Sequence, residues 1–128
     1  MKPVKRPKKR VMYYQVHVDK NIMFTIPKVR PENGFYYHYK HTSGDINNYA
    51  YEVVGVGHHT EDEVTNFVIY RPLYESSVYL AGKMFDVRPL EMFMEEVTKD
   101  GKTFPRFTKI TDPEIITKLE KVKGEMYS

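Results

Sequence analysis

Five polar side chains suited to binding an anion lie in the middle of the chain: His38, Lys40, His58, Arg71 and Arg88. Arginine presents a planar fork that fits phosphate or carboxylate, lysine adds a point charge, and neutral histidine donates or accepts one hydrogen bond. Arg71 and Arg88 each precede a proline, a position typical of a strand end. We expect the two histidines and Lys40 to converge on one face of a sheet, with the arginines beside them.

Two tyrosines in the same segments, Tyr36 and Tyr70, could stack on a base next to these polar groups. The predicted ligand site therefore has seven residues: Tyr36, His38, Lys40, His58, Tyr70, Arg71 and Arg88. In the alternative, the polar members pin loops and cap strand ends through backbone carbonyls, because buried polar groups usually satisfy structure.

Other chemistries have weaker support in the sequence. There is no cysteine, which removes disulfides and thiolate chemistry. The spacing of His38 from His41, and of His58 from His59, puts each pair on opposite faces of a strand, so we predict no metal site. Neither a nucleophile elbow nor a Walker or Rossmann motif is present. We therefore predict no catalytic residue and no cofactor, and the sequence favours a binding module over an enzyme.

The positive charge is concentrated at the start of the chain. The formal net charge is +3, yet the first ten residues carry six basic side chains and no acid, which leaves −3 for residues 11–128. We expect residues 1–10 to be a disordered basic tail. This tail either solubilises the protein or forms an arm that contacts phosphates. The arm would use Lys5, Arg6, Lys8, Lys9 and Arg10.

Short β-type segments dominate the remaining chain, residues 11–128, which we predict to be one domain. A hairpin over residues 11–26 comes first, and Pro31-Glu32-Asn33-Gly34 is a turn. Further strands are expected at 35–40, 49–58, 66–70, 78–80, 84–87, 96–98 and 104–110, with one helical turn near 88–95. Gly55 and Gly57 invite a bulge or a close approach in the central strand. This pattern favours a small, strongly bent SH3-like barrel with an added N-terminal hairpin.

One clear helix is predicted at the C-terminus, over residues 112–124. Asp112 is a good N-cap, Pro113 suits the first turn, and Gly124 can end the helix. Its apolar stripe consists of Ile115, Ile116, Leu119 and Val122. We expect this stripe to dock on the same chain, with a second subunit as the alternative.

The central motifs carry a family resemblance. They are Tyr36 to Lys40, Tyr51 to Thr60, Val68 to Tyr74, Val87 to Phe93 and the Pro105-Arg106-Phe107 end. Over residues 36–107 the chain resembles a small bacterial and phage family catalogued as domain of unknown function 1653. That resemblance implies an architecture and brings no established activity. Typical members have glycine after the lysine, where this chain has His41 and an inserted polar loop.

Taken together, the sequence predicts a non-catalytic module that binds an anionic small molecule, for which we expect a nucleotide or a nucleotide-derived signal. One alternative is a nucleic-acid-binding small barrel with a basic N-terminal arm. Another is a protein-interaction or homo-oligomer module that uses strand edges or the C-terminal helix. No apolar run is long enough to span a membrane, and the absence of cysteine is typical of a cytoplasmic protein.

Overall fold

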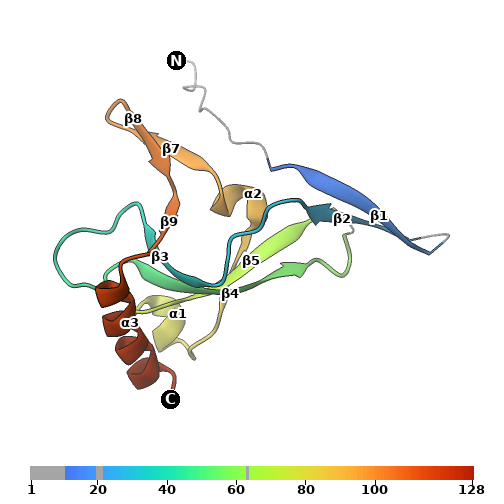
Figure 1. Ribbon diagram of the computed structural model, residues 1–128. Helices are drawn as coiled ribbons and strands as arrows, with labels where there is room; N and C mark the ends of the chain where they lie inside the picture. Colours follow the sequence, from blue (N-terminus) through green and yellow to red (C-terminus); the bar gives the residue numbers. More distant parts are fainter. Residues whose placement is uncertain (1–10, 20–21, 63) are drawn as a thin grey trace.

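A computed structural model describes residues 11–19, 22–62 and 64–128 (Figure 1). Its strands are β1 (Tyr13–Asp19), β2 (Ile22–Pro27), β3 (Gly34–His38), β4 (Ala50–His58), β5 (Asn66–Pro72), β6 (Asp86–Pro89), β7 (Glu96–Lys99), β8 (Lys102–Pro105) and β9 (Phe107–Lys109). Its helices are α1 (Ser77–Leu80), α2 (Leu90–Phe93) and α3 (Pro113–Met126). The predicted disorder of residues 1–10 falls outside the described residues.

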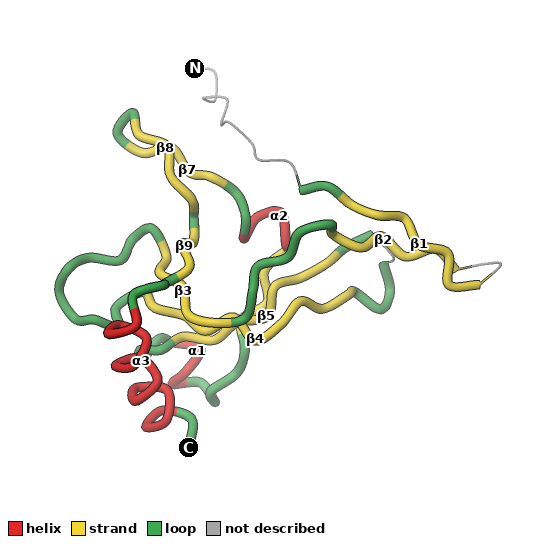
Figure 2. Tube along the Cα trace, viewed as in Figure 1, coloured by secondary structure: helices red, strands yellow, loops and turns green. Residues whose placement is uncertain are grey.

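A five-stranded antiparallel sheet forms the body, in the order β6-β5-β4-β3-β9. Two hairpins, β1–β2 and β7–β8, form separate two-stranded sheets that project from the body on different sides (Figures 1 and 2). The predicted N-terminal hairpin and the mainly-β class are therefore confirmed.

The predicted closed barrel is not formed by the described strands, since β6 and β9 remain the two edges of the main sheet. The sheet nevertheless bends. In β4 the register slips between Val53 and Gly55, which places the expected bulge there. Across the concave face, the Arg88 guanidinium of β6 lies 5.6 Å from the ring centroid of Phe107 on β9. Side chains rather than backbone hydrogen bonds thus bridge the two edges.

Each face of the sheet carries its own core cluster. The concave face buries Tyr36, Val53, Val68, Tyr70, Leu90, Phe93 and Phe107. The opposite face buries Phe35, Ala50, Leu73, Ile110 and Leu119. Leu119 belongs to α3 and is fully buried, so the helix docks on its own chain as expected. Because the apolar stripe of α3 is occupied, the predicted homo-oligomer would have to form through the sheet edges. That assembly stays a prediction.

The predicted C-terminal helix is confirmed. The Asp112 side chain accepts a hydrogen bond from the Glu114 backbone N–H at 2.9 Å, which caps the first turn. The helix continues past Gly124 to Met126. No helix in the described part of the chain combines the length and apolarity required to cross a membrane.

One predicted strand, at residues 78–80, is wrong, because this segment is the helical turn α1. Ser76 caps it by accepting a hydrogen bond from the Tyr79 backbone N–H at 3.3 Å. A good cap here outweighs the β-propensity of Val78 and Tyr79. The expected helical turn after Arg88 is present as α2, with Pro89 at its N-cap.

Candidate ligand-binding site

The structure separates the seven predicted ligand residues. Four lie close together on the concave face of the main sheet, namely Tyr36, His38, Tyr70 and Arg88. Arg71 follows Tyr70 directly within β5 and therefore points to the opposite face. His58 ends β4, seven residues beyond the pair that Tyr51 forms with Tyr36, or about 20 Å along the strand. Lys40 is exposed in the turn after β3.

Arg88 is the centre of the concave cluster. Its Nε donates a hydrogen bond to the Tyr70 hydroxyl at 3.1 Å, and its guanidinium lies over the Phe107 ring. Among the described residues, no carboxylate comes within 4.0 Å of this guanidinium. The half-buried Arg88 therefore makes no ion pair with a described residue, and it keeps the donors on its two terminal nitrogens.

His38 stands beside this cation as a neutral ring. Burial, together with the positive charges of Arg106, Arg88 and Lys40, lowers its pKa to about 4. The Lys40 backbone N–H donates to Nδ1 at 3.2 Å, so the proton of the neutral ring sits on Nε2. His38 can therefore offer one N–H donor at neutral pH.

Tyrosines form an aromatic surface next to His38. The Tyr49 ring lies 5.7 Å from the His38 ring and 5.7 Å from the Tyr74 ring, and 37% of the residue is exposed. Tyr49 has a backbone φ of +50°, which costs a non-glycine residue on the order of 1 kcal/mol. The Tyr51 and Tyr74 hydroxyls hydrogen-bond at 2.6 Å, and burial raises the pKa of both groups.

Asp86 lies two residues before Arg88 on the same face of β6. Burial raises the pKa of its carboxyl, and the charge of Arg88 opposes that shift. The two side chains make no ion pair within 4.0 Å. We call Arg88, His38, Tyr49, Tyr70 and Phe107 the Arg88 cluster.

The Arg71 cluster on the opposite face is closed on itself. Arg71 Nε contacts Glu52 Oε1 at 2.9 Å, and Lys123 Nζ from α3 contacts Glu52 Oε2 at 2.7 Å. The guanidinium lies 4.0 Å from the centroid of the Tyr127 ring, whose hydroxyl donates to the Pro72 carbonyl at 2.6 Å. The Glu52 carboxylate neutralises the Arg71 charge and accepts its Nε–H, so the alternative in which the polar residue serves the fold fits Arg71.

The whole five-stranded sheet that carries the Arg88 cluster falls within residues 34–109. The family model described as "Protein of unknown function (DUF1653)" matches those same residues. The chain belongs to the DUF1653 family. No curated protein and no solved structure shows a detectable match to the chain.

The DUF1653 unit thus contains every residue of the Arg88 cluster, whereas the Arg71 cluster needs Lys123 and Tyr127 from outside that unit. The predicted ligand site lacked two members of this cluster, Phe107, which was named only as part of a family motif, and Tyr49. The strained backbone of Tyr49 has no signature in the sequence, and this residue lies just before the family motif that starts at Tyr51.

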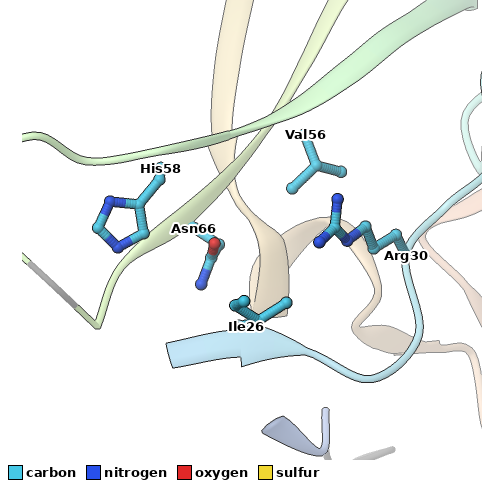
Figure 3. A pocket seen from close by; sticks show the side chains of 5 residues that line it. All are labelled: Ile26, Arg30, Val56, His58 and Asn66. Carbon is cyan, nitrogen blue, oxygen red and sulfur yellow. The ribbon is translucent and has the colours of Figure 1, made fainter. Parts of the chain in front are cut away.

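His58 lies at a different site, a pocket of about 210 Å³ (Figure 3). The pocket is lined by Ile26, Arg30, Val56, His58 and Asn66. Figure 3 shows Arg30 and His58 at its two ends with Asn66 between them. Ile26 and Arg30 precede the DUF1653 unit, so the added N-terminal segment completes this pocket. Its volume is below the roughly 300–1,000 Å³ typical of ligand pockets, which disfavours a whole nucleotide.

His41, which replaces the family's glycine, closes the inserted loop. Its ring stacks on Tyr37 at 3.6 Å, and its Nδ1 lies 2.7 Å from the Asn48 carbonyl oxygen. Within residues 11–19, 22–62 and 64–128, no three His, Cys, Asp or Glu side chains are grouped to hold a metal ion.

Proposed function

We propose that the DUF1653 unit is a non-catalytic binding module for an anionic small molecule with an aromatic part, such as a nucleotide or nucleotide-derived signal. The Arg88 cluster is its site. One observation carries the proposal: the half-buried Arg88 has no carboxylate partner among the described residues, although burying an unpaired charge is costly.

A phosphate or carboxylate would supply the missing countercharge. The Arg88 Nε donor is directed to the Tyr70 hydroxyl. The two terminal nitrogens remain for the ligand, and together they can bind two anionic oxygens in parallel. The Nε2–H of His38 adds a neutral donor on the same face. The positive charges that depress the His38 pKa would also attract an anion.

The aromatic part of the ligand would pack on tyrosine. Tyr49 is exposed and already lies against the His38 and Tyr74 rings, so a base could extend the stack. The strain at Tyr49 supports a functional role, since such strain often marks ligand sites. His38 suits binding better than general-base chemistry, because Nδ1 is occupied and its pKa is about 4.

Isothermal titration calorimetry with a panel of nucleoside mono-, di- and triphosphates and cyclic nucleotides tests the proposal. We expect at least one binder, whose affinity falls by about 10- to 100-fold in Arg88→Gln, the loss typical of a charged hydrogen bond. Arg30→Gln makes the same change at an exposed arginine outside the cluster and should leave that affinity unchanged. If the folded protein binds nothing at millimolar concentration, the proposal fails.

A further inference from the structure

The pocket beside His58 has one wall from the DUF1653 unit. Val56 and His58 are two residues apart on β4, and Asn66 lies directly opposite His58 on β5, so all three side chains share one face of the sheet. The facing wall comes from Ile26 on β2 and from Arg30, both in the added N-terminal segment (Figure 3). The family unit alone therefore forms only half of this pocket.

Hydrogen bonds hold the two walls in place. The Asn66 side-chain nitrogen donates to the Thr25 backbone carbonyl on β2 at 3.0 Å. Only 8% of Asn66 is exposed, so this bond is largely shielded from water. The same hairpin is fixed a second time, because the Tyr13 hydroxyl donates to Glu91 Oε1 of α2 at 3.1 Å. The pocket is thus preformed, which lowers the entropic cost of binding a ligand.

The polar groups of the pocket suit an anion. Its described lining contains no Asp or Glu. Arg30 stands at one end and makes no ion pair within 4.0 Å with any described residue. An amide nitrogen carries two N–H groups, and the Thr25 carbonyl is the only described acceptor for Asn66. The guanidinium fork and the remaining amide N–H can both donate to a carboxylate.

The aliphatic wall and the volume narrow the class of ligand. Ile26 and Val56 are partly buried, and covering them with hydrocarbon gains free energy in proportion to the apolar area removed from water. Inorganic phosphate has no apolar part and would leave them in contact with water. A volume of about 210 Å³ holds a molecule smaller than a nucleotide. A charged end and a short hydrocarbon chain match these features.

We propose that this pocket binds a short aliphatic carboxylate. The Arg30 guanidinium and the remaining Asn66 N–H hold the carboxylate group, and the hydrocarbon chain packs between Ile26 and Val56. His58 stands at the end opposite Arg30 and limits the chain length. A bound carboxylate also joins the added N-terminal segment to β4 and β5. The pocket shares no residue with the Arg88 cluster, so this function is separate from the proposed nucleotide binding.

Side-chain NMR spectra of the ¹⁵N-labelled full chain test the proposal, with acetate, butyrate, isovalerate and inorganic phosphate added at constant ionic strength. We expect saturable shifts of the Asn66 amide and Arg30 Nε–Hε resonances. From acetate to isovalerate, the affinity should rise by about fourfold for each CH₂ group buried. Phosphate should bind more weakly than isovalerate.

Two variants of the added segment separate a specific site from general charge attraction. Arg30→Gln should weaken isovalerate binding by about 10-fold or more, the effect of losing a charged hydrogen bond. Lys28→Gln is the matched control, because it removes a neighbouring exposed charge that does not line the pocket. It should bind isovalerate as the unmodified chain does.

Three results would overturn the proposal. The first is an Asn66 amide resonance that stays fixed at tens of millimolar isovalerate. The second is a folded Arg30→Gln variant that binds isovalerate as well as Lys28→Gln does. The third is phosphate binding as tight as that of isovalerate, which would rule out the hydrocarbon contact. None of them bears on the Arg88 cluster, whose nucleotide titration depends on other residues.

Discussion

Arg71 and Arg88 occupy similar places in the sequence but opposite environments in the structure. Each precedes a proline at the end of a strand, on the neighbouring strands β5 and β6. Directly across from Arg71 on β4 lies Glu52, which neutralises it. Across from Arg88 on β5 lies Val68, and β6 has no strand on its other side. The cross-strand partner therefore decides which arginine is committed to structure.

The C-terminal segment adds to the difference between the two arginines, because it covers the Arg71 cluster and not the Arg88 cluster. Lys123 and Tyr127 cover the Arg71 cluster from α3 and its end, and both lie beyond the DUF1653 unit. Arg88 instead contacts the Tyr70 hydroxyl and the Phe107 ring, and Asp86 on the same face of β6 makes no ion pair with it within 4.0 Å. A largely buried ion pair such as Arg71–Glu52 serves the fold, whereas a half-buried cation that has no ion pair within 4.0 Å is available for a ligand.

The largest effect is expected from Glu52→Gln, which leaves Arg71 and Lys123 without their shared carboxylate. Breaking a buried pair by removing one partner costs about 3 kcal/mol of unfolding free energy. Urea denaturation followed by circular dichroism measures it. Glu32→Gln, which removes an exposed carboxylate paired with Lys109, should cost less than about 1 kcal/mol. Equal losses in the two variants would contradict the closed Arg71 cluster.

Lowering the pH should destabilise the protein through His38 by about 2 kcal/mol, after allowance for partial exposure of the ring. Its pKa is about 4 in the folded chain, whereas an unperturbed histidine has a pKa of 6.5. Between these values the unfolded chain binds a proton that the folded chain does not, so the unfolding free energy falls as pH drops from about 6.5 to 4.

His38→Gln should remove this part of the pH dependence and keep the opposite contribution of Asp86, whose pKa is raised. Urea midpoints measured from pH 7 to pH 4 on both proteins give the difference. Identical pH profiles would mean that His38 titrates normally in the folded state.

The two arginines themselves should separate stability from binding. Arg71→Gln should lose about 1.5 kcal/mol, because Glu52 keeps Lys123 but loses one charged hydrogen bond. Arg88→Gln should change stability by less than about 0.5 kcal/mol, since one hydrogen bond is lost and an unpaired charge is also removed. Thermal and urea unfolding decide this, and a larger loss in Arg88→Gln would show that Arg88 is structural.

The smallest effect belongs to Tyr127→Phe, which keeps the ring over Arg71 and removes its hydroxyl. The lost hydrogen bond to the Pro72 carbonyl should cost about 1 kcal/mol. Tyr14→Phe, at an exposed ring, is the matched control and should cost almost nothing. No difference between the two would mean that the end of α3 does not hold β5.

The sequence predicted the elements whose signals are local. The N-terminal hairpin, the central strands and the Asp112-capped helix follow from alternation, turn residues and capping. It did not predict the open sheet, because whether β6 and β9 pair depends on curvature summed over five strands. The alternation of residues along single strands says little about the total curvature of the sheet.

The predicted site failed to converge for a simpler reason. We expected the strand to end at Tyr70, whereas β5 continues through Pro72, so alternation sends Arg71 to the face opposite Tyr70. The bulge at Val53–Gly55 brings His58 back to the concave side, yet far along β4 from His38. The sequence indicated which residue types could bind an anion. It did not indicate where the strands end, and the strand ends decide the face to which each side chain points.

The most direct measurement is the side-chain Nε–Hε NMR spectrum of ¹⁵N-labelled protein, titrated with the nucleotide panel. We expect a saturable shift of the Arg88 resonance and a fixed Arg71 resonance, because Glu52 and Tyr127 already occupy Arg71. Assignment comes from Arg88→Gln and Arg71→Gln spectra. An Arg88 resonance that stays fixed at millimolar nucleotide, or a shift confined to Arg71, would contradict the division of roles between the two arginines.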